Sequence, residues 1–303
     1  MVKVGVALGG GGARGYAHFG ALFALERSGI PVHCIAGTSM GAVVGALWAT
    51  YQHVDCYKSL KELDKAGVRD MLDPELPMVT GFLQGIKLYN LLESWFRGYT
   101  VNSLTREFCA NAVVLETGEE VTFKSGKLSD VLRASVSIPA IFSPWKIGEL
   151  NYLDGGVVNP LPVRQCREMG ADVVIAVNLF GVVPRLETVS AEHGSLEKLA
   201  SRLHIPEQVV EAVSDIPLLQ KLRNPKIPET SFTAVQISQR ALVNANLRQW
   251  QPDFLIQPDL SRYTGAEFHL VEEISDIGLE AVEKVIPEIA IKLGLPAGTF
   301  GFN

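Results

Sequence analysis

The sequence predicts an α/β fold with a mainly parallel central sheet flanked by helices and a helical cap region. Three observations lead to this fold class. Short runs rich in β-branched residues alternate with segments of helical spacing in the first fifty residues. Glycine-rich turns separate each such run from the helix that follows it. The composition, 47% hydrophobic and 20% charged over 303 residues, is that of a folded chain with a large core.

The first fifty residues contain two strand–turn–helix units. Val2–Leu8 is rich in β-branched residues and ends in glycines, so we expect a buried strand. Gly15–Ser28 places apolar side chains at helical spacing, and Gly29 stands where a C-cap glycine belongs. Cys34–Ala36 is a second buried strand, and Ser39–Thr50 is the helix that follows it. This alternation is typical of a parallel sheet covered by helices.

Two hairpins, two core strands and a closing helix are expected further along the chain. The hairpins turn at Thr117-Gly118 and Gly148, the strands are Val173–Asn178 and Phe254–Gln257, and the helix is Ile277–Leu293. Between residues 181 and 248 sheet-like runs thin out, and amphipathic helical patterns appear at Leu196–Leu203 and Glu207–Val213. We therefore expect a single domain over 1–303, with a helical cap or insertion at 181–248.

Charge and cysteine usage narrow the class of protein. The net charge of −6 gives no basic face with which to neutralise phosphates, so nucleic acid is not an expected partner. The four cysteines form no C-x-x-C pair, no signal-peptide pattern is visible, and no apolar run approaches the ~18 residues of a membrane span. We expect a cytoplasmic protein with reduced thiols, for which peripheral contact with a membrane surface stays open. The oligomeric state is not readable.

The segment 37–41 has the pattern G-x-S-x-G, formed by Gly37, Ser39 and Gly41, and lies between a predicted strand and a predicted helix. In that setting the serine hydroxyl is lifted clear of the sheet and the helix N-terminus points partial positive charge at it. Ser39 is therefore a candidate nucleophile. The alternative is a serine that only caps the helix, with glycines that serve the turn.

The glycine-rich segment 9–15 also lies between a strand and a helix. Gly10, Gly12 and Gly15 fit a dinucleotide-binding fingerprint, but no acidic residue follows about 20 positions later, and the lysine of a phosphate-binding loop is missing. The other interpretation is an oxyanion hole, in which backbone N–H groups at Gly10, Gly11 and Gly12 would each stabilise a transition state by roughly 3–4 kcal/mol. Arg14 either anchors this loop, which we favour, or binds a lipid phosphate.

Asp154-Gly155-Gly156 follows a strand-like run, and such a tripeptide on its own is often only a turn. Its significance comes from the need of a nucleophilic serine for a proton acceptor. None of the six histidines lies in a recognisable catalytic setting. A carboxylate held against the hydroxyl and partly desolvated can act as the base directly, so Asp154 is a candidate.

These three motifs occur in the order and spacing of the patatin-like phospholipases, which the sequence resembles. Ala17–Leu22, Ala134–Phe142 and Asp154–Pro160 look like the same family. The resemblance covers about residues 1–180 and returns weakly near residues 252–258 and in the last helix. The bacterial members related to neuropathy target esterase are the most similar branch.

The resemblance implies a patatin-like three-layer fold and hydrolysis of a lipid or fatty-acyl ester through an acyl-enzyme. Position by position, it makes Ser39 the nucleophile, Asp154 its base and Gly10–Gly12 the oxyanion hole, with no metal and no cofactor. Ala140 stands where many relatives have glycine. One alternative is a regulatory or scaffold protein that retains the hydrolase core and binds a partner. Acyl transfer to an alcohol uses the same residues and also stays open.

Overall fold

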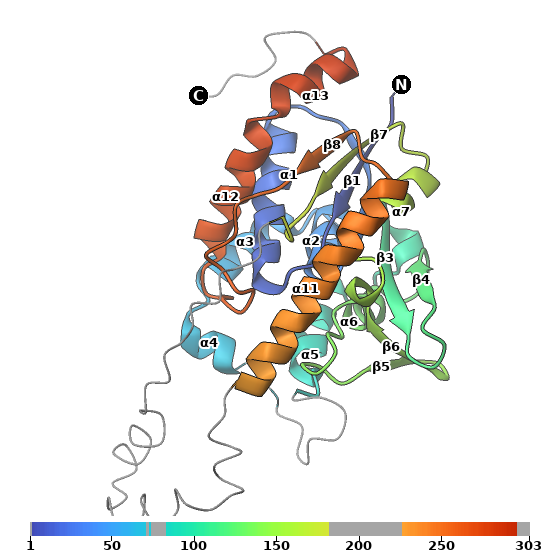
Figure 1. Cartoon of the computed structure of the whole chain (residues 1–303), viewed down its shortest axis with the longest axis vertical. Helices are drawn as coiled ribbons and strands as arrows, with labels where there is room; N and C mark the ends of the chain where they lie inside the picture. The colour runs from blue at the N-terminus through green and yellow to red at the C-terminus, as the bar shows by residue number, and fades with distance from the viewer. Residues whose placement is uncertain (1, 71–72, 74–82, 182–225, 296–303) are drawn as a thin grey trace, which may run out of the picture. The chain divides into compact units, whose positions relative to one another are not determined.

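Eight strands form one mixed sheet in the part of the chain that the computed structural model describes, residues 2–70, 73, 83–181 and 226–295 (Figure 1). The strands are β1 (Val4–Leu8), β2 (Val32–Thr38), β3 (Glu107–Val114), β4 (Glu120–Phe123), β5 (Trp145–Ile147), β6 (Leu150–Asp154), β7 (Val173–Val177) and β8 (Phe254–Ile256). Their order is β5-β6-β3-β2-β1-β7-β8, with β4 paired to β3. The run from β3 to β8 is parallel, whereas β4 and β6 are antiparallel to β3 and β5 is antiparallel to β6.

Helices cover both faces of this sheet. They are α1 (Ala17–Arg27), α2 (Met40–Ala49), α3 (His53–Lys61), α4 (Lys65–Asp70), α5 (Ile86–Phe96), α6 (Leu128–Ser135), α7 (Val163–Glu168), α11 (Lys226–Gln249), α12 (Val271–Glu283) and α13 (Ile286–Leu293). Side chains alternate along β1. Val4, Val6 and Leu8 pack with α1, α2 and α12, and Ala7 packs on the opposite face with α7 and the later part of α11. The predicted fold class, a mainly parallel sheet between helices, is confirmed.

The predicted final helix is wrong as a single element. We expected one helix over Ile277–Leu293, but α12 ends at Glu283 and α13 begins at Ile286. Pro287 lies in the first turn of α13. A proline has no N–H to donate, and its ring clashes with the carbonyl four residues earlier, so the helix cannot continue through it.

Two compact units are distinguished in the chain, residues 1–184 with 236–303 and residues 185–235. Of the second unit, only the beginning of α11, from Lys226, falls among the described residues. The predicted cap helices at Leu196–Leu203 and Glu207–Val213 lie outside the described residues, so the cap stays a prediction.

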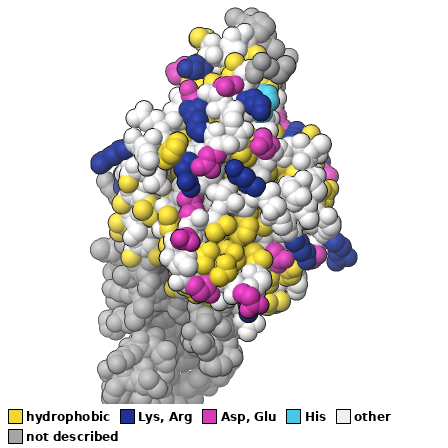
Figure 2. Space-filling view, turned by 90° about the vertical axis from the view of Figure 1, so that its right-hand side faces the viewer, with side chains coloured by type: hydrophobic (Ala, Val, Ile, Leu, Met, Phe, Trp, Pro, Cys, Tyr) yellow, Lys and Arg dark blue, Asp and Glu magenta, His cyan; other side chains and the backbone are white. Residues whose placement is uncertain are grey.

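The surface in Figure 2 shows acidic and basic side chains interspersed around a cluster of hydrophobic ones. No basic face dominates this view, which agrees with the net charge of −6. Within the described ranges, no helix has both the length and the apolar character to cross a membrane.

Candidate active site

The register of the sheet brings Ser39 and Asp154 to the same edge. Thr38, the last residue of β2, pairs with Asn111 of β3. The next residue of β3, Ala112, pairs with Asp154 at the end of β6. Because β2 and β6 both end at this level of β3, two residues that are 115 positions apart in sequence meet above the central strands.

Ser39 adopts a backbone conformation that is rare for a residue with a side chain. It lies between β2 and α2 with φ 54° and ψ −125°, and it is 4% exposed. Such a conformation is strained and persists only where the surrounding structure enforces it. Its hydroxyl makes no capping hydrogen bond to α2, although Ser39 is the N-cap residue. The alternative of a serine that serves only as a helix cap is therefore not supported.

Close backbone approach explains the glycines on either side of Ser39. A Cβ atom at Gly37 would lie 2.4 Å from Cα of Ala42, and a Cβ atom at Gly41 would lie 2.2 Å from the carbonyl oxygen of Leu8. Any side chain at either position would push α2 away from β1 and β2. The two glycines therefore hold the N-terminus of α2 against the sheet, directly behind the serine.

The Asp154 carboxyl is buried, and only one of its two oxygens has a hydrogen-bond partner in the described part of the chain. Its Oδ1 accepts a hydrogen bond of 2.7 Å from the Gly156 amide, whereas Oδ2 is buried and has no hydrogen-bond partner among the described residues. Burial raises the pKa of Asp154 to about 7, against smaller opposing effects of the neighbouring Ser39 hydroxyl and the Gly156 amide. The hydroxyl is close enough to lower this pKa, although Oδ2 itself accepts no hydrogen bond in the described part of the chain. An unpaired carboxyl oxygen beside a serine hydroxyl is suited to accept its proton.

The glycine-rich loop passes against the serine, but its amides are not equivalent. The Gly10 amide donates to the Pro160 carbonyl at 3.0 Å, so it is already used. A Cβ atom at Gly10 would lie 3.4 Å from the Ser39 Cβ, which shows how closely the loop approaches the serine. The amides of Gly11 and Gly12 donate to no residue in the described part of the chain. Of the three predicted oxyanion donors, these two are free to bind an oxyanion.

The buried side chains of Arg14 and His18 both contact the glycine-rich loop. The Arg14 side chain is 1% exposed, its Nε donates to the Gly11 carbonyl at 3.5 Å, and its guanidinium lies over the Phe180 ring. Burial lowers the pKa of Arg14 to about 10. A buried guanidinium fits the anchoring role better than contact with a lipid phosphate. Gly15 follows in the same turn, where a Cβ atom would lie 2.2 Å from the Met40 side chain.

His18 is the second buried group at this loop. Its Nε2 bonds the Gly9 carbonyl at 2.7 Å, and because a carbonyl only accepts, Nε2 carries the proton. Burial lowers the pKa of His18 to about 4, so the ring is neutral. Within the described ranges no histidine hydrogen-bonds Ser39 or Asp154: His33 accepts from the Val4 amide, and His53 pairs with Glu26.

Gly155 and Gly156 form the turn that follows Asp154. A Cβ atom at Gly155 would lie 2.4 Å from Oδ1 of Asn111, and one at Gly156 would lie 2.5 Å from Nε2 of Gln239. The turn is thus wedged between β3 and α11, which fixes the backbone on which the Asp154 carboxyl stands.

A family model described as patatin-like phospholipase matches residues 6–167, more than half of the chain. This chain belongs to the patatin-like phospholipase family. The match begins in β1, ends in α7, and contains the glycine-rich loop, Ser39 and Asp154. The membership predicted from the three motifs is confirmed.

Relatives named after neuropathy target esterase confirm the predicted branch. An uncharacterized NTE family protein of Mycobacterium tuberculosis is 35% identical over 179 residues, which are 59% of this chain and 49% of that protein. Lysophospholipase NTE1 of Kluyveromyces lactis is 30% identical over 304 residues, 98% of this chain and 20% of that protein. The chain thus spans half or less of these relatives. The crystal structure of VipD from Legionella pneumophila aligns with 95% of this chain and 67% of that one, at 13% identity and a TM-score of 0.49.

This patatin-like chain has an apolar cavity of about 160 Å³ whose lining includes both Ser39 and Gly12. Its other walls are mostly aliphatic and aromatic side chains of α1 to α5 and of the segment after α6, for example Phe19, Val44, Leu47, Leu92, Val136 and Phe142. An engineered apolar cavity of about 150 Å³ in another protein admits benzene. The cavity beside Ser39 can therefore hold a short apolar group.

Sequence reasoning missed the residues that position the two candidate catalytic groups of this patatin-like site. The Ser39 amide donates to Oγ of Ser135 at 3.0 Å, and the Asp154 amide donates to the Ser137 carbonyl at 2.9 Å. The signal in the sequence is the pair Ser135 and Ser137 ahead of Ile138-Pro139, in a stretch that carries the family resemblance but no catalytic motif.

Proposed function

We propose that this chain hydrolyses lipid acyl esters, with Ser39 as the nucleophile and Asp154 as its base. The observation that carries the proposal is the environment of Asp154. Its carboxyl is buried beside the Ser39 hydroxyl and keeps one oxygen without a hydrogen-bond partner in the described part of the chain. A pKa of about 7 suits a base that works at neutral pH, since both protonation states are accessible there.

The reaction proceeds in two balanced halves. Asp154 takes the Ser39 proton while Oγ bonds to the ester carbonyl carbon, and the oxygen of that carbonyl becomes the oxyanion that the Gly11 and Gly12 amides stabilise. The C–O bond to the alcohol then breaks, and the alkoxide leaves with the proton from Asp154. In the second half Asp154 takes a proton from water, which attacks the acyl-serine, and the fatty acid leaves as Ser39 recovers its proton.

Two observations support a lipid substrate. The cavity beside Ser39 is apolar and suits the acyl part of an ester. Membership of the patatin-like phospholipase family supports lipid hydrolysis, and the Kluyveromyces lactis relative bears the name lysophospholipase. We therefore propose a phospholipid, a lysophospholipid or another fatty-acyl ester as the substrate, met at a membrane or micelle surface.

A screen of acyl esters of increasing chain length against wild type and Ser39→Ala tests this function. We expect turnover by the wild type and a loss of several orders of magnitude in the variant. Equal low turnover by both proteins, each shown to be folded by a thermal melt, would favour the scaffold alternative, which needs no nucleophile.

A further inference from the structure

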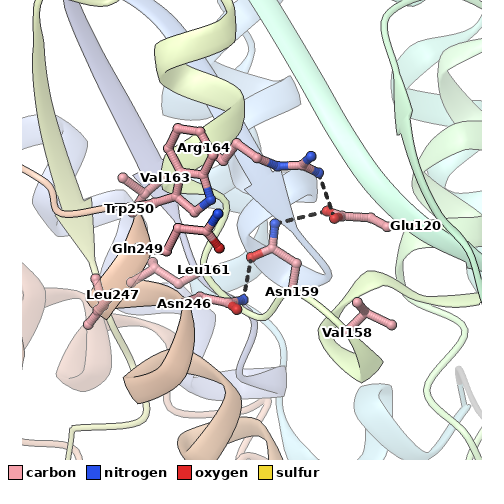
Figure 3. Close-up of a pocket in the computed structure, with 10 residues that line it drawn as sticks. All are labelled: Glu120, Val158, Asn159, Leu161, Val163, Arg164, Asn246, Leu247, Gln249 and Trp250. Atoms are coloured by element: carbon pink, nitrogen blue, oxygen red, sulfur yellow. Dashed lines mark hydrogen bonds and ion pairs between the residues drawn. The ribbon is translucent and has the colours of Figure 1, made fainter.

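A second cavity, of about 240 Å³, lies on the face of the sheet that α7 and the later part of α11 cover (Figure 3). Its residues come from β4, from the segment 158–164 and from the end of α11. They are Glu120, Val158, Asn159, Leu161, Val163, Arg164, Asn246, Leu247, Gln249 and Trp250. None of these residues borders the apolar cavity beside Ser39.

One side of this cavity is a chain of hydrogen-bonded polar groups (Figure 3). Asn246 donates to the Asn159 side-chain oxygen at 3.3 Å, Asn159 donates to Glu120 at 2.8 Å, and Arg164 donates to the other oxygen of Glu120 at 2.7 Å. Glu120 and Arg164 neutralise one another, and Arg164 also lies 3.6 Å from Glu168. A charged ligand would have to break this pairing, so the cavity suits a neutral one.

The other side combines apolar surface with unused hydrogen-bonding groups. The side chains of Leu161, Val163 and Leu247 lie here with the indole of Trp250. The Trp250 indole N–H and the Gln249 amide make no hydrogen bond to any described residue, and the side-chain oxygen of Asn246 accepts none. Unpaired donors and acceptors thus border the same cavity, and hydroxyl groups, which both donate and accept, can satisfy both kinds.

We propose that this cavity, the polyol cavity, binds a small neutral polyol such as a monosaccharide or a cyclitol. The C–H face of its ring would lie on the indole and the aliphatic side chains, while its hydroxyls bond the amides. A water takes about 30 Å³ in the liquid, so a cavity of about 240 Å³ has room for roughly eight waters or for one sugar-sized ring.

The segment that lines the polyol cavity also contacts the two turns of the candidate active site. The hydroxyl of Thr38, the residue before Ser39, has two acceptors within reach for its one proton, the side-chain oxygen of Asn111 at 2.8 Å and the Asn159 carbonyl at 3.0 Å. The Pro160 carbonyl accepts from the Gly10 amide at 3.0 Å. The segment 159–161 therefore turns two side chains toward the cavity and two carbonyls toward the serine turn and the glycine loop. Occupancy of the cavity changes reactivity at Ser39 through this segment, a consequence that rests on the proposed function.

Titration of the full chain with myo-inositol, D-glucose and D-galactose tests the site by intrinsic fluorescence. Of the four tryptophans, only Trp250 borders the cavity. We expect a saturable change for at least one ligand, with a Kd on the order of 1 mM for a molecule of about twelve heavy atoms. The change should persist in Trp145→Phe, vanish in Trp250→Phe, and require about tenfold more ligand in Asn246→Leu. Glycine betaine at equal osmolality serves as the solvent control.

Three outcomes overturn the site. The first is no saturable change up to about 100 mM, which is roughly a hundredfold above the expected Kd. The others are the same change in folded Trp250→Phe and the same change with betaine. The coupling is tested by labelling Ser39 with a fluorophosphonate, at saturating ligand and without it. We expect the labelling rate to change by about fivefold, the lower end of ordinary coupling. Binding with no change in rate contradicts the coupling. Absence of any labelling counts against the hydrolase alone, because the fluorescence readout does not involve Ser39.

Discussion

The backbone amide of Ser39 donates a hydrogen bond of 3.0 Å to Oγ of Ser135, the last residue of α6. Two residues later, the Ser137 carbonyl accepts from the Asp154 amide, and the Ser137 hydroxyl accepts from the buried guanidinium of Arg133 at 2.7 Å. One short segment therefore contacts the backbone of both candidate catalytic residues. The distance between nucleophile and base depends on it.

We predict that Ser135→Ala slows the chemistry of the site. The buried Ser39 amide would lose its partner, which costs about 1–3 kcal/mol, and the strained serine turn would relax. We expect kcat to fall by about tenfold or more with little change in KM, since the substrate contacts remain. Ester turnover and the rate of fluorophosphonate labelling measure this.

Ser129→Ala is the matched control for that prediction. Ser129 lies on the same helix, is equally buried, and donates to Glu93 at 2.5 Å, which is neither of the two candidate catalytic residues. Both variants should melt at a lower temperature. If Ser129→Ala slows labelling as much as Ser135→Ala does, the effect is general destabilisation and the positioning role is wrong.

The raised pKa of Asp154 predicts opposite pH trends for activity and stability. The base works as a carboxylate, so kcat/KM should rise with pH along a limb with its midpoint near the Asp154 pKa of about 7. The folded chain keeps a proton that the unfolded chain releases near pH 4. The stabilising effect of this group is therefore complete below about pH 4 and is lost as the pH rises through 7.

Asp154→Asn isolates both trends, because the amide does not titrate. The variant should lose activity at every pH. Its melting temperature should rise relative to that of the wild type between pH 4 and pH 8. An activity limb centred near pH 4 would show that the working carboxylate is exposed to solvent.

The sequence singles out the two candidate catalytic residues more readily than the residues that hold them in place. Ser39 and Asp154 each lie in a local motif at the end of a predicted strand, and such motifs are visible in a short window. The contacts of Ser135 and Pro160 depend on how β3, β6 and the loop after β6 come together, which no local pattern encodes. For the same reason Gly10 was predicted as an oxyanion donor, although its amide is used by Pro160.

Acyl-chain length should control turnover through the apolar cavity beside Ser39. Burial of each methylene contributes about 0.8 kcal/mol, so kcat/KM for p-nitrophenyl esters should rise about fourfold per added carbon. The rise should end near six carbons, the size of apolar group that a cavity of this volume admits.

Leu91→Trp should move the end of that rise to shorter esters, because Leu91 lines the cavity on α5. Leu255→Trp, at a 40% exposed position on β8, is the control and should leave the length profile unchanged. A flat profile in the wild type would show that this cavity does not hold the acyl chain.

Ala140 stores backbone strain that glycine would relieve. Its φ of 66° lies in the left-handed region, which costs an alanine about 1–2 kcal/mol, and the residue is exposed. Ala140→Gly should therefore raise the free energy of unfolding by up to about 1 kcal/mol, after the added flexibility of the unfolded chain is subtracted. Gly148→Ala, at φ 61° with open space around it, should lower it. Chemical denaturation measures both, and a destabilised Ala140→Gly contradicts the strain.

Covalent labelling of Ser39 tests the central claim most directly. Wild type and Asp154→Asn are treated with a fluorophosphonate, and the adduct is located by peptide mass spectrometry while a thermal melt confirms that both proteins are folded. We predict one adduct per wild-type chain, on Ser39, and labelling of Asp154→Asn slowed by at least about a hundredfold, the lower part of the range for a general base. A folded wild type without an adduct on Ser39, or an Asp154→Asn variant labelled as fast as wild type, would contradict the Ser39–Asp154 dyad.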